Sequence, residues 1–399
     1  MSGRQVMKSL RLRPREDRRL RTGHPWIYSN EIDTRATPLK AFEPGELAVV
    51  TDARGYALGI AYVNPHTLIA ARVLTRHADA CIDRDFFVTR LARALRLREH
   101  CLGRPFYRWV HGEADALPGL VIDRYGDHLS MQVNTAGMER LRSLLLDAIE
   151  AVVPAKGIVL RNDAPARALE GLPTGIETLG AVPERVEVEE DGARFVTSLC
   201  RGQKTGWFYD QVDNRRRLPR YVHGLRVLDL FGYAGAWSVQ ALRHGALEAV
   251  CVDSSAPALD LAQANAERNG LADRLTLIEG DAFDVLRELR EAGERFDLVI
   301  CDPPAFIKRR RDRKPGMEAY VRLNRQALRL VSEEGFLITC SCSHHLALED
   351  FRQVVRRAAS GAGRRVQILE TGHQSLDHPV HPAIPETDYL KALFLRVTG

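Results

Sequence analysis

Several features that define common protein classes are missing from this sequence of 399 residues. It contains no run of eighteen or more apolar residues, so we expect no transmembrane helix and no membrane partner. The N-terminus is basic but lacks the apolar segment of a secretory signal peptide. The seven cysteines are odd in number and form no regular framework, which is typical of a reducing compartment. Together these absences predict a cytoplasmic protein.

Two ligand-binding signatures are also missing. The loop after the apolar run 227–230 lacks the G-x-G-x-x-G spacing of dinucleotide binders, because Gly232 and Gly235 are three residues apart. A nicotinamide-dependent oxidoreductase is therefore the weakest of the enzyme classes to consider. Zinc sites usually combine two ligand pairs, whereas the cysteines and histidines of segment 340–345 have no distant second pair. We therefore expect no metal.

Positive charge is concentrated in two places. The net charge of +5 and the hydrophobic content of 45% are ordinary for a globular protein. Residues 1–22, however, contain eight Arg or Lys and two acids, and residues 308–314 contain six and one. Such clusters suit a polyanion, although a solvated surface explains either cluster equally well.

The length predicts two or three domains. In residues 1–76, Pro and Gly separate short β-type runs, which predicts a small β-barrel. In residues 77–195 the pattern predicts a helix over 83–100, paired strands at 120–123 and 129–133, a helix over 138–153, and strands at 157–160 and from 195. This second segment is expected to form a small α+β domain.

Residues 196–399 show a different pattern, in which strands and helices alternate. The predicted helices cover 236–244, 257–269, 282–292 and 320–331, and the predicted strands cover 227–230, 249–252, 275–278, 298–301 and 335–340. Alternation of this kind predicts an α/β fold with a parallel, doubly wound, Rossmann-like sheet.

Acidic residues end four of these strands: Asp229, Asp253, Asp281 and Asp302. Ligands of doubly wound sheets bind at the carboxyl ends of the strands. Asp253 is placed to bind both hydroxyls of a ribose, and Asp281 to reach an adenine edge, although a helix cap also explains Asp281. Without pyrophosphate-binding glycines, the series favours S-adenosylmethionine. The predicted cofactor site comprises Asp229, Phe231, Gly232, Tyr233, Gly235, Asp253, Ser254, Asp281, Ala282 and Asp302.

A proline-rich motif, Asp302-Pro303-Pro304-Ala305-Phe306, follows the fourth strand. Its prolines fix the backbone, and Phe306 offers a ring on which a target base can stack. The motif alone does not separate methylation at a base nitrogen from methylation at carbon. The basic residues Lys308, Arg309 and Arg310 come directly afterwards and are expected to bind RNA phosphates.

A cysteine pair, Cys340 and Cys342, follows the fifth strand. Carbon 5 of a pyrimidine becomes nucleophilic when a thiolate adds to carbon 6, so Cys342 is a candidate covalent catalyst and Asp302 a candidate partner of ring nitrogen 3. Simple burial also explains Cys342, and strand alternation does not choose between the two thiols. A disulfide between them would be strained.

These motifs resemble the ribosomal RNA large subunit methyltransferase I family over nearly the whole chain. The family resemblance rests on Gly23–Ile32, His111–Arg124, Lys204-Thr205-Gly206 with Asp210-Gln211, the Asp229 loop, Asp302-Pro303-Pro304, Ser341-Cys342-Ser343 and Asp377-His378-Pro379.

The resemblance implies three domains: a PUA domain over 1–76, a central α+β domain over 77–195 and a Rossmann-like methyltransferase domain over 196–399. It implies Cys342 as the nucleophile, S-adenosylmethionine as the cofactor and a cytosine in large-subunit ribosomal RNA as the substrate, and it is compatible with a homodimer. Two alternatives stay open. One is a methyltransferase acting on a base nitrogen, and the other is an RNA-binding or ribosome assembly factor without catalysis.

Overall fold

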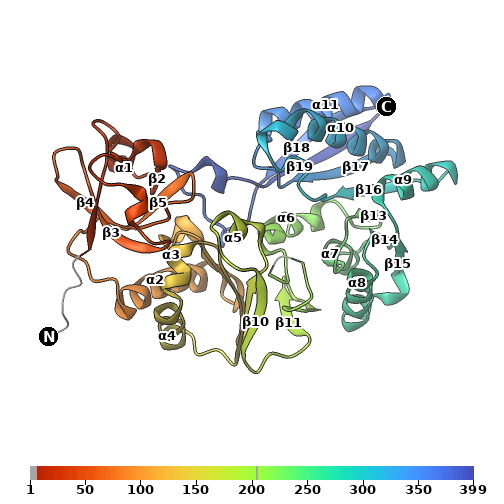
Figure 1. Ribbon diagram of the computed structural model, residues 1–399. Helices are drawn as coiled ribbons and strands as arrows, with labels where there is room; N and C mark the ends of the chain where they lie inside the picture. Colours follow the sequence, from red (N-terminus) through yellow and green to blue (C-terminus); the bar gives the residue numbers. More distant parts are fainter. Residues whose placement is uncertain (1–6, 204) are drawn as a thin grey trace. The chain divides into compact units, whose positions relative to one another are not determined.

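The chain, seen here as a computed structural model, is described for residues 7–203 and 205–399. Its contacts divide it into two compact units (Figure 1). The first comprises the described part of Met1–Val186, Ser198–Trp207 and Pro379–Thr387. The second comprises Glu187–Thr197, Phe208–His378 and Asp388–Gly399. Ser198–Trp207 and Pro379–Thr387 therefore belong to the first unit although residues of the second unit precede and follow each of them.

The first unit begins with a small β-barrel. Its strands are β1 (Lys8–Arg11), β2 (Trp26–Tyr28), β3 (Glu46–Thr51), β4 (Ala57–Val63) and β5 (Ile69–Thr75), in the order β1-β3-β4-β5-β2, with the short helix α1 (Arg18–Arg21) after β1. An isolated bridge between Leu12 and Ile32 joins the segments that follow the two edge strands, which closes the sheet. The predicted barrel is confirmed.

A second sheet of five strands completes the first unit. It has the order β10-β9-β8-β7-β6 and consists of β6 (Phe106–His111), β7 (Leu120–Tyr125), β8 (His128–Val133), β9 (Gly157–Asn162) and β10 (Gly175–Gly180). The helices of this region are α2 (Arg84–Leu102), α3 (Ala136–Arg140), α4 (Arg142–Val152) and α5 (Pro165–Leu169). The Asp83 carboxylate caps α2 by accepting a hydrogen bond from the Phe86 N–H. The helix predicted over 138–153 is interrupted at Leu141 and forms two helices.

The acidic segment 184–191, for which no strand was predicted, contains one. Strand β11 (Val186–Glu190) pairs with β12 (Ala193–Thr197), and its residues Val186, Val188 and Glu190 are buried. The alternation of buried and outward positions is that of a strand. The charged residues obscure the pattern because one of them, Glu190, lies on the buried face.

The second unit is built on a sheet of seven strands, in the order β15-β14-β13-β16-β17-β19-β18. The five predicted strands are parallel, as expected: β13 (Arg226–Leu230), β14 (Glu248–Asp253), β15 (Leu275–Glu279), β16 (Phe296–Cys301) and β17 (Val331–Ser341). Strand β19 (Lys391–Thr398) lies antiparallel between β17 and β18 (Arg365–Gly372). The sheet is therefore mixed, which corrects the prediction of a parallel sheet.

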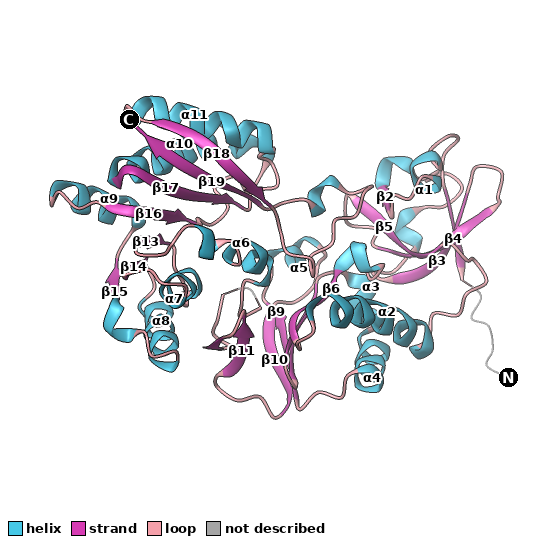
Figure 2. Cartoon of the chain, turned by 180° about the vertical axis from the view of Figure 1, so that it is seen from behind, coloured by secondary structure: helices cyan, strands magenta, loops and turns pink. Residues whose placement is uncertain are grey.

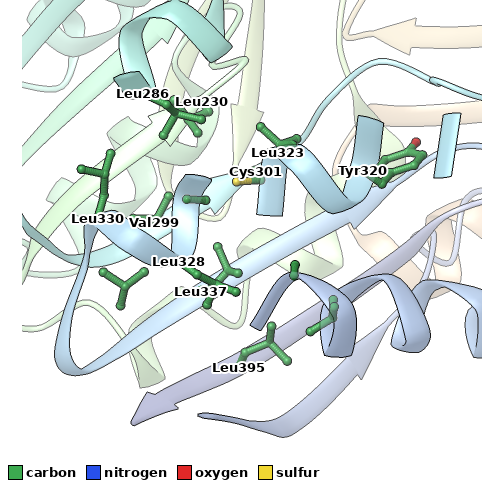
Figure 3. Close-up of a cluster of buried hydrophobic side chains, with 14 of the residues drawn as sticks. Leu230, Leu286, Val299, Cys301, Tyr320, Leu323, Leu328, Leu330, Leu337 and Leu395 are labelled. Atoms are coloured by element: carbon green, nitrogen blue, oxygen red, sulfur yellow. The ribbon is translucent and has the colours of Figure 1, made fainter. Parts of the chain in front are cut away.

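Helices cover both faces of this sheet (Figures 1 and 2). One face carries α7 (Ala236–Arg243) and α8 (Ala256–Arg268), and the other carries α9 (Ala282–Glu291), α10 (Arg313–Leu330) and α11 (Leu348–Ala362). A large apolar core lies beneath α9, α10 and α11, where side chains such as Leu230, Val299 and Leu328 pack together (Figure 3). Leu228 and Leu230 belong to this core, so Asp229 between them faces the other side of the sheet, toward α7.

Helix α10 begins seven residues before the predicted start at 320. The basic run 308–314 is therefore not a loop throughout, since Arg310–Asp312 form a 3-10 turn and Arg313 and Lys314 open the helix. Among the described residues, no helix is long and apolar enough to cross a membrane.

Candidate active site

Three of the four predicted acidic residues come together at the carboxyl edge of the seven-stranded sheet. Strand β13 lies between β14 and β16, so Asp229 at its end has Asp253 on one side and Asp302 on the other. The backbone connects the same edge, because the Gly232 N–H donates to the Val252 carbonyl at 3.0 Å. The predicted gathering of strand-end carboxylates at one edge of the sheet is confirmed, and binding of a ligand there stays a prediction.

Asp229 is the most deeply placed of the three. Its side chain is 0% exposed, and Oδ2 accepts hydrogen bonds from the Ser238 N–H at 3.2 Å and the Ser238 hydroxyl at 2.7 Å. Its Oδ1 is buried and has no hydrogen-bond partner among the described residues. Burial raises the pKa of Asp229 to about 7, and the negative charges of Asp302 and Asp253 act in the same direction against the Ser238 bonds.

The loop after β13 has an unusual backbone. Phe231 and Tyr233 both have positive φ angles, of 64° and 48°, which side chains other than glycine rarely adopt. Such conformations concentrate at functional sites. Gly232 between them is also required by packing, because a Cβ there would lie 2.3 Å from the Cys251 sulfur. Gly235, with φ of 73°, opens α7.

The outer part of the predicted cofactor site is organised by backbone amides. Asp253 is half-buried, and its carboxylate accepts hydrogen bonds from the Tyr233 N–H at 2.9 Å and the Ser255 N–H at 3.0 Å, while Ser254 is exposed. Asp281 caps α9 by accepting from the Phe283 N–H at 2.8 Å, and Ala282 behind it is buried. The capping role foreseen for Asp281 is thus present, and its contact with an adenine edge stays a prediction.

This arrangement fits a cationic cofactor. S-adenosylmethionine carries positive charge on its sulfonium and its ammonium groups. Asp229 has a buried oxygen without a partner, and the charges of Asp253 and Asp302 disfavour its ionisation. A bound cation would lower the cost of holding these carboxylates together. The donor set therefore matches the cofactor predicted from the strand ends.

Asp302 is held from two sides. Its Oδ1 accepts a hydrogen bond from the Gln211 Nε2 at 2.8 Å, and its Oδ2 accepts from the Trp237 Nε1 at 3.2 Å. Gln211 is in turn fixed by the Asn214 Nδ2, which donates to its Oε1 at 2.7 Å. The sequence analysis names Gln211 only as part of the family resemblance, and Lys204 of the same motif lies outside the described residues. Gln211 reaches the candidate catalytic carboxylate.

The two thiols of the cysteine pair have different surroundings. Cys340 lies inside β17 and is 0% exposed, and burial raises its pKa well above the usual value, with the charge of Asp302 adding to the effect. Cys342 lies just beyond the last residue of β17 and is half-buried, with its sulfur 3.8 Å from the Pro303 carbonyl oxygen. Cys342 is therefore the thiol next to the proline motif, a distinction that strand register alone did not make.

The backbone around Cys342 is fixed by its two serine neighbours. The Ser341 hydroxyl donates to the Tyr320 hydroxyl at 2.9 Å, and the Ser343 and Tyr320 hydroxyls are also 2.9 Å apart. The Ser343 Oγ accepts from the Ile307 N–H at 3.1 Å, which ties this turn to the proline motif. The sequence did not predict that Tyr320 belongs to the site. The one signal for it is that a side chain with a hydroxyl group occupies the buried face of α10.

The residues predicted to bind the RNA have mixed settings. Phe306 is half-buried, and its ring centroid lies 4.7 Å from that of Tyr320 and 6.3 Å from that of Phe283, so part of its ring packs inside the protein. Lys308, Arg309 and Arg310 are exposed. Within the described ranges these three residues make no ion pair.

Among the residues that the structure describes, no group of three or more His, Cys, Asp or Glu side chains could hold a metal ion.

Comparison with known proteins identifies two family matches within the chain. Residues 10–76 match the model of a PUA-like domain, and residues 162–396 match that of an S-adenosylmethionine-dependent methyltransferase. Two proteins named ribosomal RNA large subunit methyltransferase I are similar to this chain: the one from Tolumonas auensis is 40% identical to it, and the one from Erwinia tasmaniensis is 38% identical. Each of these alignments covers 94% of this chain and 95% of the relative.

The chain belongs to the ribosomal RNA large subunit methyltransferase I family. It is an S-adenosylmethionine-dependent methyltransferase, which confirms the predicted enzyme class and cofactor. Among solved structures, a methyltransferase complexed with S-adenosylhomocysteine superposes with a TM-score of 0.83 over 98% of this chain and 100% of its own, at 22% identity. This likeness confirms the fold of a class I methyltransferase joined to a PUA-like domain.

Proposed function

We propose that this methyltransferase makes 5-methylcytosine in large-subunit ribosomal RNA, with Cys342 as a covalent nucleophile and Asp302 as the partner of the base. The observation that carries the proposal is the position of Cys342. Its sulfur lies beside the Asp302-Pro303-Pro304 motif, at the edge of the sheet where the cofactor carboxylates gather.

The chemistry follows from the inertness of cytosine. The Cys342 thiolate adds to carbon 6, forming a carbon–sulfur bond and moving the electron pair of the 5,6 double bond toward carbon 5. The bound cofactor would supply an electrophilic methyl group, with S-adenosylhomocysteine as the leaving group. In its protonated form, Asp302 stabilises the adduct by donating a hydrogen bond to ring nitrogen 3. After the new carbon–carbon bond forms, a base removes the proton from carbon 5, the double bond returns and the Cys342 thiolate leaves.

Affinity for RNA is proposed to come from surfaces on both units. In the second, the unpaired cations Lys308, Arg309 and Arg310 follow the proline motif closely in sequence, where they would bind phosphates next to the target base. The relatives are named for ribosomal RNA of the large subunit, which supports that substrate here.

In the first unit, a cavity of about 540 Å³ provides a second basic surface. Arg76, Arg90 and Arg93 line it with three histidines, and Glu113 is the one acid among the described residues of its wall. Burial and the nearby charge of Arg93 lower the pKa of Arg90 to about 10. Neighbouring guanidinium groups with so little compensating acid favour an anion, and we propose that an RNA phosphate occupies this cavity.

The domain assignment stays part of the proposal: 1–76 as the PUA RNA-binding domain, 77–195 as the central domain and 196–399 as the catalytic domain. Because a ribosomal RNA substrate is met where ribosomes are assembled, we also propose a cytoplasmic location. A homodimer is proposed on the family resemblance alone, and sedimentation would test it.

The test of the function is the identity of the methylated nucleoside. Unmodified large-subunit RNA is incubated with the enzyme and methyl-labelled S-adenosylmethionine, digested, and analysed by mass spectrometry against nucleoside standards. The proposal expects labelled 5-methylcytidine. Label in a base carrying an N-methyl group would favour the competing function, methylation of a base nitrogen by the Asp302-Pro303-Pro304-Ala305-Phe306 motif without covalent catalysis.

Two variants make the result specific to the thiol. Cys342→Ala is expected to give no product while still binding S-adenosylmethionine by calorimetry. Cys81→Ala removes an exposed thiol in the first unit and should leave the product yield unchanged. Product formation by Cys342→Ala would refute covalent catalysis at this residue.

A further inference from the structure

Lys391 is a buried lysine that contacts the two neighbours of the candidate nucleophile in the sequence. It is the first residue of β19, and in the antiparallel pairing with β17 it stands opposite Ser341, the residue before Cys342. Its Nζ donates a hydrogen bond at 2.8 Å to the carbonyl of Ser343, the residue after Cys342. The lysine therefore contacts the backbone on both sides of the thiol.

The lysine side chain is unusually enclosed. Residue Lys391 is 7% exposed, and its second hydrogen bond goes to the Tyr389 carbonyl at 2.7 Å. Both acceptors are neutral carbonyls, and among the described residues no carboxylate forms a hydrogen bond or ion pair with the ammonium. Burying a positive charge without a paired carboxylate costs free energy of folding, which suggests that the charge of Lys391 has a functional role.

The titratable groups near the Cys342 thiol indicate what this role is. Tyr320 from α10 and Cys340 from β17 are neutral at pH 7, since burial raises the pKa of both. Two carboxyl groups also act in this region, since Asp302 raises the pKa of the Cys340 thiol and Asp388 opposes the lowering of the pKa of Lys391. Among the described residues, Lys391 is a cation whose charge interacts with Cys342, and burial lowers its pKa to about 8 while Asp388 and Cys342 oppose that shift.

We propose that Lys391 is a positioning residue that stabilises the thiolate of Cys342 and holds the turn 341–343 in place for attack on carbon 6. The inference rests on the proposed function and extends it, because it explains how a thiol beside carboxylates becomes nucleophilic near neutral pH. A neighbouring ammonium group favours the thiolate electrostatically. Removing the charge while keeping a hydrogen-bond donor should separate this effect from anchoring of the turn.

The test is the pH dependence of Cys342 alkylation, which requires neither RNA nor turnover. Iodoacetamide labelling of the Cys342 peptide is followed by mass spectrometry from pH 5 to 10 in the full-length protein. Lys391→Gln removes the charge and keeps a donor, and Lys391→Arg keeps both. Arg396→Gln is the matched control, because Arg396 lies on the same strand and pairs with Glu334 on the surface.

The wild-type profile should have its midpoint below about 8.5, the ordinary thiol pKa. Lys391→Gln should raise the midpoint by about one pH unit, which lowers the fraction of thiolate at pH 7 by about tenfold. Alkylation at pH 7 should slow by only about threefold, because the thiolate of a less acidic thiol is intrinsically more nucleophilic. Lys391→Arg should restore most of the shift, and Arg396→Gln should match wild type.

A wild-type midpoint at or above the ordinary thiol pKa would overturn the proposal without any variant. So would coincident profiles for wild type and Lys391→Gln. Either result would leave the methylation product and its dependence on Cys342 untouched, so failure of this inference is distinguishable from failure of the proposed function.

Discussion

Cofactor binding should depend on pH through Asp229, because the structure holds this carboxyl buried with a pKa of about 7 instead of 3.8. In the free enzyme at pH 6 about nine in ten molecules carry the neutral acid, and at pH 8 about one in ten. A cationic cofactor binds the ionised form. Binding at pH 6 must therefore displace a proton, and the affinity for S-adenosylmethionine should fall about tenfold from pH 8 to pH 6.

The same shift predicts an opposite effect on the stability of the free enzyme. A carboxyl whose pKa is raised on folding contributes stability below its unfolded pKa, and this contribution is lost as pH rises through the folded pKa. Three pKa units correspond to about 4 kcal/mol of unfolding free energy at most, lost between about pH 4 and pH 7. The cofactor should recover much of this loss, so its thermal stabilisation of the protein should increase with pH.

Calorimetry at pH 6 and pH 8 measures the pH dependence of the affinity for S-adenosylmethionine. The variant Asp229→Asn is the reference, because any effect of titrating the ligand itself is the same in both proteins. The variant should bind S-adenosylmethionine more weakly at pH 8, show a flatter pH dependence and, without ligand, unfold at higher denaturant concentration than wild type. Asp273→Asn, at an exposed acid of the same unit, should behave as wild type. Equal pH dependence in wild type and Asp229→Asn would refute the reasoning.

Three further perturbations test other parts of the site. Gln211→Ala removes a hydrogen bond to the Asp302 carboxylate and should lower kcat by about ten- to a hundredfold in a methyl-transfer assay; full activity would show that this bond does not orient Asp302. Replacing residues 308–310 by glutamine should reduce the slope of log affinity for RNA against log salt by about 2, and an unchanged slope in filter binding would exclude them from phosphate contact. Arg215→Met removes the guanidinium group that pairs with buried Glu190 and should cost about 3–5 kcal/mol in urea unfolding, much of it recovered when Glu190→Met is added; a loss below about 1 kcal/mol would contradict the importance of the pair.

The sequence predicts the five parallel strands because each is a short apolar run followed by a turn and an amphipathic helix. It does not predict β18 and β19 correctly, since the insertion of β19 between β17 and β18 depends on pairing between distant segments. Strand β11 was missed because Glu190 on its buried face is neutralised by Arg215, 25 residues away. Helix α10 was predicted too short because its first turn contains Pro315 and Gly316, which are typical of turns and loops.

For the site, residues at strand ends were predictable, and residues arriving from elsewhere were not. Asp229 and Asp302 follow apolar strands, so their position alone suggested their place at the sheet edge. Gln211 and Lys391 reach the same edge from a 3-10 turn and from the start of an unpredicted strand. The one local sign was the alternation Ser341-Cys342-Ser343, whose two hydroxyls turn out to fix the backbone around the thiol.

The central claim is that Cys342 forms a covalent bond with cytosine, and a mechanism-based trap measures it most directly. Wild type, Cys342→Ala and Cys340→Ala are each mixed with S-adenosylmethionine and large-subunit RNA containing 5-fluorocytidine, which lacks the proton whose removal releases the enzyme. The account predicts a denaturant-resistant protein–RNA adduct that is lost only in Cys342→Ala. An adduct lost only in Cys340→Ala would move the nucleophile to the buried thiol. The absence of any adduct, in a preparation that methylates unmodified RNA, would contradict the covalent mechanism.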